Sequence, residues 1–366
     1  MKLHLCMIVL LAILACERND NNFHRVKISE LMIADSIGSE TDSLRMLGVI
    51  GSTACLPNGD LLVLDTGFNT LRLFPDSGEV SVLVSEGSGP GLLQQASEMV
   101  LAADRILIMD RGKRCILKYD SQGNYLDDDI ESGIMQPYGL FGLDNGNLVT
   151  MMLDFQMDEN NEIELFIRIA QCDQDLNPVT EFYYRTWDSP YNQLYSTITS
   201  LRYAVSSGGL FYLCEDPSIY TVTVMDGAGD TVSVITRDDI GRVQLSDAEI
   251  EEIRALQRES LGNEYLFQGE NEPSHYRSLI RLAGADSLGR LWVWDLRYIE
   301  DNLIHFDIWD SSGTLVEMAE IPWPDFREPV VPRVDSGGVI LTTNEEASEV
   351  KIYRLEYSGY LMDSSF

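Results

Sequence analysis

Basic residues are few in this 366-residue chain. Its 26 Lys and Arg stand against 59 Asp and Glu, which gives a formal net charge of −33. Binding to nucleic acid requires a basic face that pairs with phosphates, so this deficit argues against a nucleic-acid partner. It also argues against electrostatic adhesion to anionic lipid. An acidic surface of this kind favours solubility and cationic partners.

Histidine and known catalytic motifs are scarce as well. The chain has four histidines, widely separated along the sequence, which argues against a three-histidine zinc site. It contains no GxSxG, no HExxH and no phosphate-binding P-loop. The sequence therefore favours a protein that binds a ligand over one that catalyses a reaction.

Long apolar runs are also missing, since crossing a bilayer takes about 20 residues. The run Leu5–Ala15 follows Lys2 and has the charged start, apolar core and small-residue end of a secretory signal. It ends in ILAC, which resembles a bacterial lipobox with Cys16 as the lipidated residue. We expect a signal peptide over 1–15, a polar tether over 16–23 and a folded domain over 24–366, held to the membrane by the lipid anchor alone. An ordinary signal peptide with Cys16 left free is the alternative.

Four cysteines remain in the folded part, and their spacing matches no CxxC metal pattern. They are Cys55, Cys115, Cys172 and Cys214. A core of this size does not need covalent staples, so buried free thiols are favoured over disulfides.

What the chain does have is an internal repeat. Residues 56–80 and 102–126 each contain a turn, an apolar strand that ends in Asp, a polar turn, an alternating strand and a Gly turn. The Asp and the Gly lie 13 residues apart in both copies, Asp65 to Gly78 and Asp110 to Gly123. Looser copies open near residues 144, 207, 286 and 335. Two hairpin turns per unit predict four-stranded antiparallel sheets. Six such sheets predict an all-β, six-bladed propeller, with a sandwich or a solenoid as the alternative.

The segment GSGPG at 87–91, followed by ILIMD and ILKYDSQGNYL, carries a family resemblance, and so does SLGRLWVWD at 287–295. The chain resembles the NHL-type six-bladed β-propeller lipoproteins of bacterial envelopes over about residues 24–366. The resemblance departs where Leu92 and Leu93 replace the acidic and aromatic residues usual in that group. It implies a fold and an extracytoplasmic, envelope-attached location, facing the periplasm or the cell surface. It does not imply one activity, because propellers bind ligands and also serve as lyases and lactonases.

Two further elements are predicted outside the repeat. Ser246 and Glu249 form a capping box that opens a helix within residues 244–263, inside an insertion at about 241–275 between blades four and five. We expect this insertion to lie over the face that carries the loops after each second strand. Residues 24–32 alternate as a strand would, and we expect them to pair with the last blade, residues 329–366, and close the ring.

The candidate site lies on that same face, where second strands end. Acidic or amide side chains recur there: Asp65, Asp110, Glu215, Asp295 and Asn344, with Asp154 as the counterpart in blade three. Arg111 and Arg114 form a basic cluster beside Asp110, and Tyr298 lies in a long loop after Asp295. A ring of carboxylates could hold Ca²⁺, the one cofactor we consider. Turn capping, in which Asp accepts bonds from backbone N–H groups, is the simpler explanation and the one we favour.

From the sequence we expect a lipid-anchored binding or scaffold module for an envelope protein, a peptide or a glycan at this loop face. A purely structural or assembly lipoprotein is a further possibility. A metal-dependent hydrolase of the lactonase type, or a lyase, is the alternative. The sequence leaves the oligomeric state open.

Overall fold

The structure is a computed structural model. It describes residues 27–38, 42–56, 58–131, 137–157, 163–173, 176–187, 201–261, 275–301, 303–322, 330–335, 337–343 and 350–357. The described chain is almost entirely β, as predicted. No helix within these ranges is long and apolar enough to cross a membrane.

The two best repeats each form one four-stranded antiparallel sheet with its strands in chain order. The first sheet contains β2 (Ile50–Cys55), β3 (Leu61–Asp65), β4 (Thr70–Phe74) and β5 (Ser81–Val84). The second contains β6 (Ala96–Ala102), β7 (Arg105–Asp110), β8 (Cys115–Asp120) and β9 (Tyr125–Glu131). The 13-residue spacing has a clear basis, because the second strand ends at the Asp and the Gly takes a positive φ, 128° at Gly78 and 81° at Gly123.

The looser copies three and four fold in the same way. The third sheet contains β10 (Tyr138–Gly142), β11 (Leu148–Met157), β12 (Ile163–Cys172) and β13 (Pro178–Trp187). The fourth contains β14 (Arg202–Val205), β15 (Phe211–Cys214), β16 (Thr221–Met225) and β17 (Thr231–Thr236). Strand β11 is ten residues long, so Asp154 lies inside it and not at its end. The prediction that Asp154 follows a second strand is therefore wrong.

The last two repeats join into one eight-stranded sheet that closes on itself, in the order β1-β21-β20-β19-β18-β22-β23-β24. One half contains β18 (Ile280–Ala285), β19 (Leu291–Asp295), β20 (Leu303–Trp309) and β21 (Leu315–Pro322). The other contains β22 (Val330–Asp335), β23 (Gly338–Thr343), β24 (Ile352–Tyr357) and β1 (Lys27–Ile37). The structure therefore has four separate four-stranded sheets and this closed one, where we expected six separate sheets.

The N-terminal strand closes the ring, as predicted. Strand β1 pairs antiparallel with β24, with Leu31 opposite Tyr357 and Ile37 opposite Ile352. It also pairs parallel with β21, with Lys27 opposite Glu317, which the sequence did not predict. This second pairing covers the edge of β21 and merges the two halves of the closed sheet.

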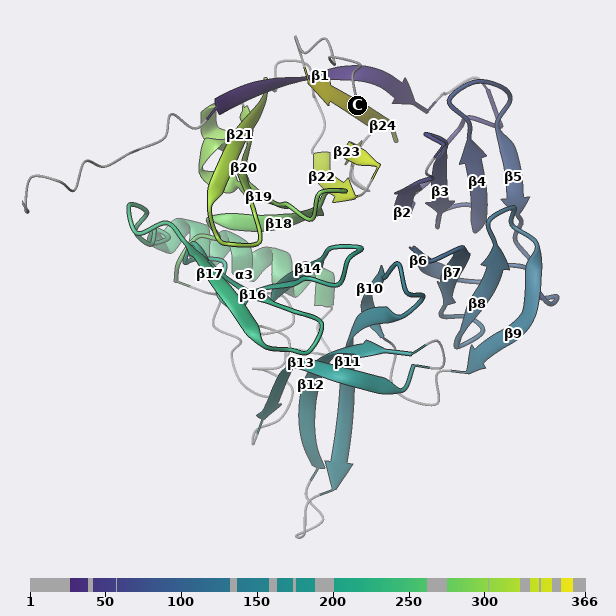
Figure 1. Ribbon diagram of the computed structural model, residues 1–366, viewed down its shortest axis with the longest axis horizontal. Coiled ribbons are helices and arrows are strands. Elements are labelled where there is room, and N and C mark those ends of the chain that lie inside the picture. Colours follow the sequence, from purple (N-terminus) through teal and green to yellow (C-terminus); the bar gives the residue numbers. More distant parts are fainter. Residues whose placement is uncertain are drawn as a thin grey trace, which may run out of the picture.

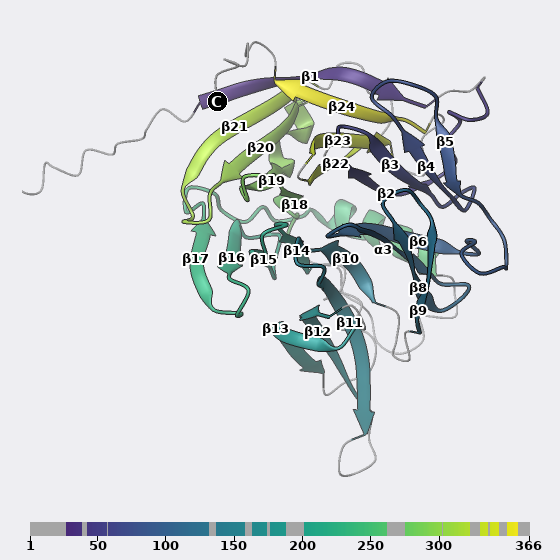
Figure 2. The same cartoon turned by 45° about the vertical axis from the view of Figure 1, so that its right-hand side comes forward.

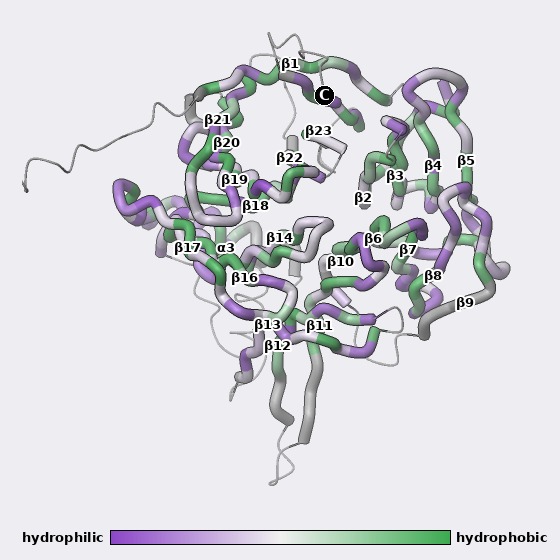
Figure 3. Tube along the Cα trace, in the orientation of Figure 1, coloured by the Kyte–Doolittle hydropathy of each residue, from purple (hydrophilic) through white to green (hydrophobic). Residues whose placement is uncertain are grey.

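The sheets surround a common centre (Figure 1). The strands nearest to it are β2, β6, β10, β14, β18 and β22. Apolar clusters fill the seams between neighbouring sheets. Leu62, Leu64 and Leu71 of the first sheet, for example, pack with Ile106 and Leu117 of the second. Figure 3 shows the same distribution, with hydrophobic residues along the strands and hydrophilic ones at the turns. The sheets are therefore held together mainly by burial of apolar surface between their faces.

Helix α3 (Asp247–Leu261) lies in the insertion, and its capping box has formed. The Glu249 amide donates to the Ser246 hydroxyl (3.3 Å), and the Glu249 carboxylate accepts from the Ser246 amide (2.8 Å). Figures 1 and 2 both place α3 behind the ring of sheets. A short 3-10 helix, η1 (Leu296–Asp301), follows β19.

Candidate functional site

We call the end of the ring that carries the turns after each second strand, at 66–69, 111–114, 215–220 and 296–301, the loop face. The insertion lies on this face, as expected. Arg242, just before α3, pairs with Asp216 of the third of these turns at 2.7 Å. Leu279, just after the insertion, donates its amide to the Pro217 carbonyl at 2.7 Å. These contacts fix the insertion to the fourth sheet.

Asp65 is fully buried and serves as a turn cap. Its carboxylate accepts bonds from the amides of Gly48 (2.9 Å), Val49 (3.2 Å) and Phe68 (3.1 Å), and the Arg72 guanidinium lies 3.9 Å away. One side chain therefore ties the turn after β3 to the segment that leads into β2. The capping explanation is confirmed for this residue.

Asp110 does the same in the second sheet and is also fully buried. It accepts from the amides of Gln94 (2.7 Å), Gln95 (3.1 Å) and Lys113 (3.0 Å). The same carboxylate thus orders both the turn after β7 and the segment that enters β6. Since all three partners are backbone amides, Asp110 positions the site wall but does not itself face a ligand.

A hollow of about 540 Å³ lies beside that wall, open to solvent, at the seam of the first two sheets. Polar and backbone groups line it, including Glu86, Gly87, Ser88, Gln94, Gln95 and Gly112. The GSGPG segment forms one side and is tied down by Lys113, whose Nζ donates to the Gly89 carbonyl at 2.6 Å, and by Tyr119, whose hydroxyl donates to the Gly91 carbonyl at 3.2 Å. The volume is in the range of small-ligand sites, and the open shape suits an extended ligand.

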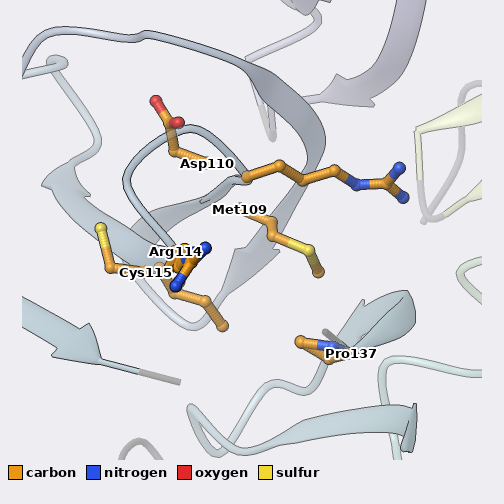
Figure 4. A pocket seen from close by; sticks show the side chains of 7 residues that line it. Met109, Asp110, Arg114, Cys115 and Pro137 are labelled. Atoms are coloured by element: carbon orange, nitrogen blue, oxygen red, sulfur yellow. The ribbon is translucent and has the colours of Figure 1, made fainter. Parts of the chain in front are cut away.

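A second cavity lies on the other side of β7–β8 and is too small for a ligand. It measures about 10 Å³, room for about one water molecule. Figure 4 shows Met109 extending toward Pro137 while the Asp110 carboxylate points away from both. Arg111 and Arg114 contribute to its lining and are otherwise exposed on the turn. The predicted basic cluster therefore exists as a surface feature, close to the hollow but not within its lining.

The other predicted residues do not join a ring of carboxylates. Glu215 is exposed at the end of β15. Asn344 and the lipidation residue Cys16 lie outside the described residues. Within the described ranges, no group of three His, Cys, Asp or Glu side chains is arranged to hold a metal ion.

Asp295 and Tyr298 belong to a different cluster, on the closed sheet. Asp295 is fully buried, and Arg297 donates to it through its amide (3.0 Å) and through Nη2 (2.6 Å). The Tyr298 ring stacks on His305 of β20, with 4.3 Å between centroids and an interplanar angle of 23°. The ion pair with Arg297 compensates the Asp295 charge, so this carboxylate also has a structural partner.

Sequence reasoning missed the network beneath these residues, which joins the fourth sheet to β20. Asp307 is fully buried and accepts bonds from the Tyr220 hydroxyl (2.6 Å) and from Arg237 Nη1 (3.0 Å). His305 contacts it through Nε2 (3.3 Å) and contacts Glu320 through Nδ1 (3.0 Å). The Tyr220 hydroxyl in turn accepts from Trp309 Nε1 (3.0 Å). Three donors therefore surround one buried carboxylate.

The network shifts the pKa values of Asp307, His305 and Tyr220. Burial alone raises the pKa of Asp307, but the bonds from His305 and Tyr220 and the charge of Arg237 outweigh it and lower that pKa. Burial lowers the pKa of His305, whereas the Asp307 and Glu320 carboxylates raise it by more. Burial and Asp307 together raise the pKa of Tyr220 well above its usual value. The ionised form of Asp307 and the protonated form of His305 are both favoured.

One signal in the sequence could have pointed to this network. Strand LIHFDIW is apolar except for His305 and Asp307, which are two residues apart and therefore point to the same face. Two polar residues on one face of a buried strand require partners there. Their partners lie 70 and 87 residues away in sequence, so the pattern alone could not identify them.

Among the described residues, the four cysteines of the folded part form no disulfide, as favoured from the sequence. Cys115, Cys172 and Cys214 are buried and Cys55 is half-buried. Burial raises the pKa of Cys55 and of Cys214 to about 12, and that of Cys172 to about 11. Thiols with such pKa values carry almost no thiolate at neutral pH and are poor nucleophiles.

Comparison with known proteins adds information on the fold alone. No protein-family profile and no curated protein sequence matches this chain. Among solved structures, a protein of Bacteroides fragilis inferred to be exported is similar over 91% of this chain and 100% of its own, with a TM-score of 0.52 and 14% identity. That likeness shows a shared fold.

Weaker likenesses extend to other β-propeller proteins. Regucalcin from Agrobacterium tumefaciens, a calcium-binding protein, is 12% identical with a TM-score of 0.46, over 91% of this chain and 97% of that one. A streptogramin B lyase is 10% identical with a TM-score of 0.45, over 89% of this chain and 98% of that one. The propeller-like arrangement itself is seen directly in the ring of small four-stranded sheets.

Proposed function

We propose that this protein is an exported, lipid-anchored β-propeller that binds a protein, peptide or glycan of the cell envelope at its loop face. The observation that carries the proposal is the open hollow of about 540 Å³ at the seam of the first two sheets. Its lining combines the apolar Leu93 with carboxylate, hydroxyl, amide and backbone groups, and the polar groups can recognise a ligand through hydrogen bonds. A shallow, wet surface of this kind suits a ligand that lies across it.

The second support is the way in which the hollow is built. Gln94 and Gln95 are held from behind by the buried Asp110, and the GSGPG segment is held by Lys113. Binding surfaces gain affinity when their groups are already positioned before the ligand arrives. The loop face therefore offers a preorganised polar surface whose wall residues need no large rearrangement.

We further propose that the ring has six blades, as the repeat predicts. The closed eight-stranded sheet would then be two blades, β18–β21 and β22–β24 with β1, linked at their edges. Apolar clusters support this division, because each occupies one seam. Trp292 and Phe306 of the first half pack with Val334 and Leu341 of the second, as neighbouring blades do elsewhere in the ring. Ile340 and Ile352 likewise pack with Leu61 and Val63 of the first sheet.

The proposed location follows from the N-terminal sequence, with Cys16 as the lipid site. The exported neighbour from Bacteroides fragilis is consistent with an extracytoplasmic location. Cells grown with labelled palmitate should label the wild-type protein, and Cys16→Ser should abolish the label. An unlabelled, fully soluble wild type would refute the anchor but leave the proposed binding surface untouched.

Site-specific photo-crosslinking tests the proposed binding surface. A photoreactive residue replaces Gln95 in the hollow, and in the matched control it replaces Gln122, an exposed glutamine on the β8–β9 turn at the opposite end of the sheet. Full-length protein in intact cells should form a discrete adduct from position 95 and none from position 122. A glycan array probed with wild type and Gln95→Ala covers ligands that do not crosslink. The same adducts from both positions, or no ligand in either assay, would refute the proposal. Ca²⁺-dependent turnover of a lactone panel would instead favour the hydrolase alternative.

A further inference from the structure

Three arginines lie on neighbouring inner strands of this acidic protein. They are Arg202 on β14, Arg281 on β18 and Arg333 on β22. Figure 1 shows these three strands side by side around the centre of the ring. The approach is closest between β18 and β22, where Gly284 pairs with Val334 and a Cβ on Gly284 would lie 1.9 Å from the Val334 carbonyl oxygen.

Arg202 and Arg281 occupy equivalent positions in their sheets. Each pairs with the residue that precedes the acidic end of the next strand: Arg202 lies opposite Cys214, before Glu215, and Arg281 opposite Trp294, before Asp295. Their guanidinium groups therefore start from the same level of the ring, near the loop face. Arg333 begins further along the axis, one residue before Val334.

The three guanidinium groups have no carboxylate partner in the part of the chain that the structure describes. Among the described residues, no Asp or Glu oxygen lies within salt-bridge distance of any of them, whereas most other described arginines form such pairs. Arg202 donates to the carbonyl of Leu201 (3.1 Å) and Arg333 to that of Gly51 (3.2 Å). Arg281 has no hydrogen bond to any part of the chain that the structure describes.

The surroundings of the three arginines are confined but wet. Arg202 and Arg281 are partly accessible to solvent and Arg333 is exposed. Burial nevertheless lowers the pKa of all three, and Arg281 lowers the pKa values of Arg202 and Arg333 further through charge repulsion. The three side chains are therefore accessible to solvent and yet close enough to surrounding protein for burial to act on them. Positive charges gathered in such a place are costly unless a counter-charge joins them.

Two acids lie near the cluster but are already engaged. Glu98 on β6 accepts from the amides of Gly139 (3.2 Å) and Leu140 (2.8 Å). Asp335 accepts from the amides of Gly337 (2.8 Å) and Cys55 (3.4 Å). Both act on Arg333 through space, whereas the lowered pKa of Arg281 is due to burial. Within the described residues, Arg202 and Arg281 therefore have no carboxylate at salt-bridge distance.

We propose that Arg202, Arg281 and Arg333 form an anion site on the axis of the ring, which takes a carboxylate, phosphate or sulfate group through the loop face. Guanidinium groups present paired donors that match the oxygens of these groups. The net charge of −33 opposes a free anion at long range, but charges beyond about 8 Å are screened at physiological ionic strength, so the nearest groups dominate. This site is separate from the hollow of the first two sheets and does not depend on the function proposed for it.

Thermal unfolding and calorimetry of the purified protein test the site. Inorganic phosphate and malonate serve as probes for the phosphoryl and carboxylate forms of the ligand, each against sodium chloride at equal ionic strength. At least one probe should raise the melting temperature of wild type and bind with a measurable heat. Arg281→Gln and Arg202→Gln should each weaken that binding at least ten-fold. The matched control Arg45→Gln, at an exposed arginine paired with Asp42, should leave it unchanged.

The unliganded variants provide a second, independent readout. Because an unpaired charge is removed, Arg281→Gln without ligand should melt at the wild-type temperature or above. A marked loss of stability in that variant would show that the arginine is structural and would overturn the proposal. Wild type that responds to neither probe would also overturn it, as would a response that survives in the Arg202→Gln, Arg281→Gln double variant.

Discussion

Substitution of Asp307 should lower the stability of the protein more than most other substitutions in the ring. Arg237 provides an internal comparison, because it pairs with a second carboxylate that can be substituted in the same way. This guanidinium pairs with two carboxylates, the buried Asp307 at 3.0 Å and the exposed Asp239 at 2.9 Å. The Asp307 side chain is 0% exposed and that of Asp239 is 64% exposed. The variants Asp307→Asn and Asp239→Asn each remove one negative charge from the same arginine, so they differ mainly in burial.

The expected costs follow from that difference. Breaking a buried ion pair by removing one partner costs about 3–5 kcal/mol, because the remaining charges stay desolvated. Arg237 keeps Asp239 and some solvent contact, so we expect the lower end, about 3 kcal/mol, for Asp307→Asn. An exposed pair contributes about 0.2–1 kcal/mol, so Asp239→Asn should cost less than about 1 kcal/mol. An unfolding entropy of about 2.1 cal/mol/K per residue makes 3 kcal/mol equal to a fall of about 4 °C in melting temperature.

Urea unfolding followed by tryptophan fluorescence measures both costs. Trp309 is a local reporter, since its indole N–H donates to the Tyr220 hydroxyl that itself donates to Asp307. Equal free energies of unfolding for the two variants would refute the argument from burial. So would an Asp307→Asn variant within about 1 kcal/mol of wild type, since it would mean that water or rearrangement replaces the lost charge.

Three further predictions concern the same architecture. The pKa of His305 in the folded protein is raised above the ordinary value of about 6.5, so protonated His305 stabilises the protein below that pH, and this contribution is lost as the pH rises through the folded pKa. His305→Gln should therefore flatten the fall in melting temperature between pH 6 and 9, and a profile parallel to that of wild type would contradict this. Leu31→Ala in β1 should cost about 3 kcal/mol, whereas Met32→Ala beside it, 53% exposed, should stay within about 0.5 kcal/mol of wild type; equal costs would argue against closure of the ring by β1. Asp65→Ala leaves three backbone amides unpaired and should lower the free energy of unfolding by about 3 kcal/mol, as measured by urea unfolding. Asp104→Ala, at an exposed position, should change it by almost nothing, and similar values for both variants would refute the capping role.

The fold was predictable because its signals are local and repeated. In the two best copies, turn chemistry sets the Asp and the Gly 13 residues apart, and the strands between them alternate in the expected way. The capping box of α3 lies within four residues and formed as predicted. The strand pairing that joins the last two repeats into one sheet was not predictable, because the parallel pairing of Lys27 with Glu317 joins residues that are far apart in the chain.

The site was less predictable for a related reason. The repeat drew attention to Asp65 and Asp110, residues that recur because every unit needs its turn capped. A residue that recurs because it caps a turn in the repeat is seldom a ligand-binding residue, because a single ligand binds at only one place in the ring. The polar groups that break the pattern, such as His305 and Asp307, carry more information about a particular site, since a buried strand accepts them only when another blade supplies partners.

The same reasoning explains the contrast between Glu98, Arg202 and Arg281. Their strands place them at one equivalent inner position of three units, opposite the residue that precedes an acidic strand end. Glu98 is satisfied by two backbone amides of the next sheet, so its charge is accounted for within the fold. Among the described residues, Arg202 donates to one backbone carbonyl, that of Leu201, and Arg281 forms no hydrogen bond, although an Arg at that level costs desolvation just as a Glu does. The fold can satisfy a charged side chain at this position with backbone groups, as it does for Glu98. An Arg without a carboxylate partner at the same position of two adjacent units is therefore explained more simply by ligand binding than by a contribution to stability. Removal of Arg281 is therefore the change that best separates the two explanations, because it should leave folding intact and abolish only the response to an anion.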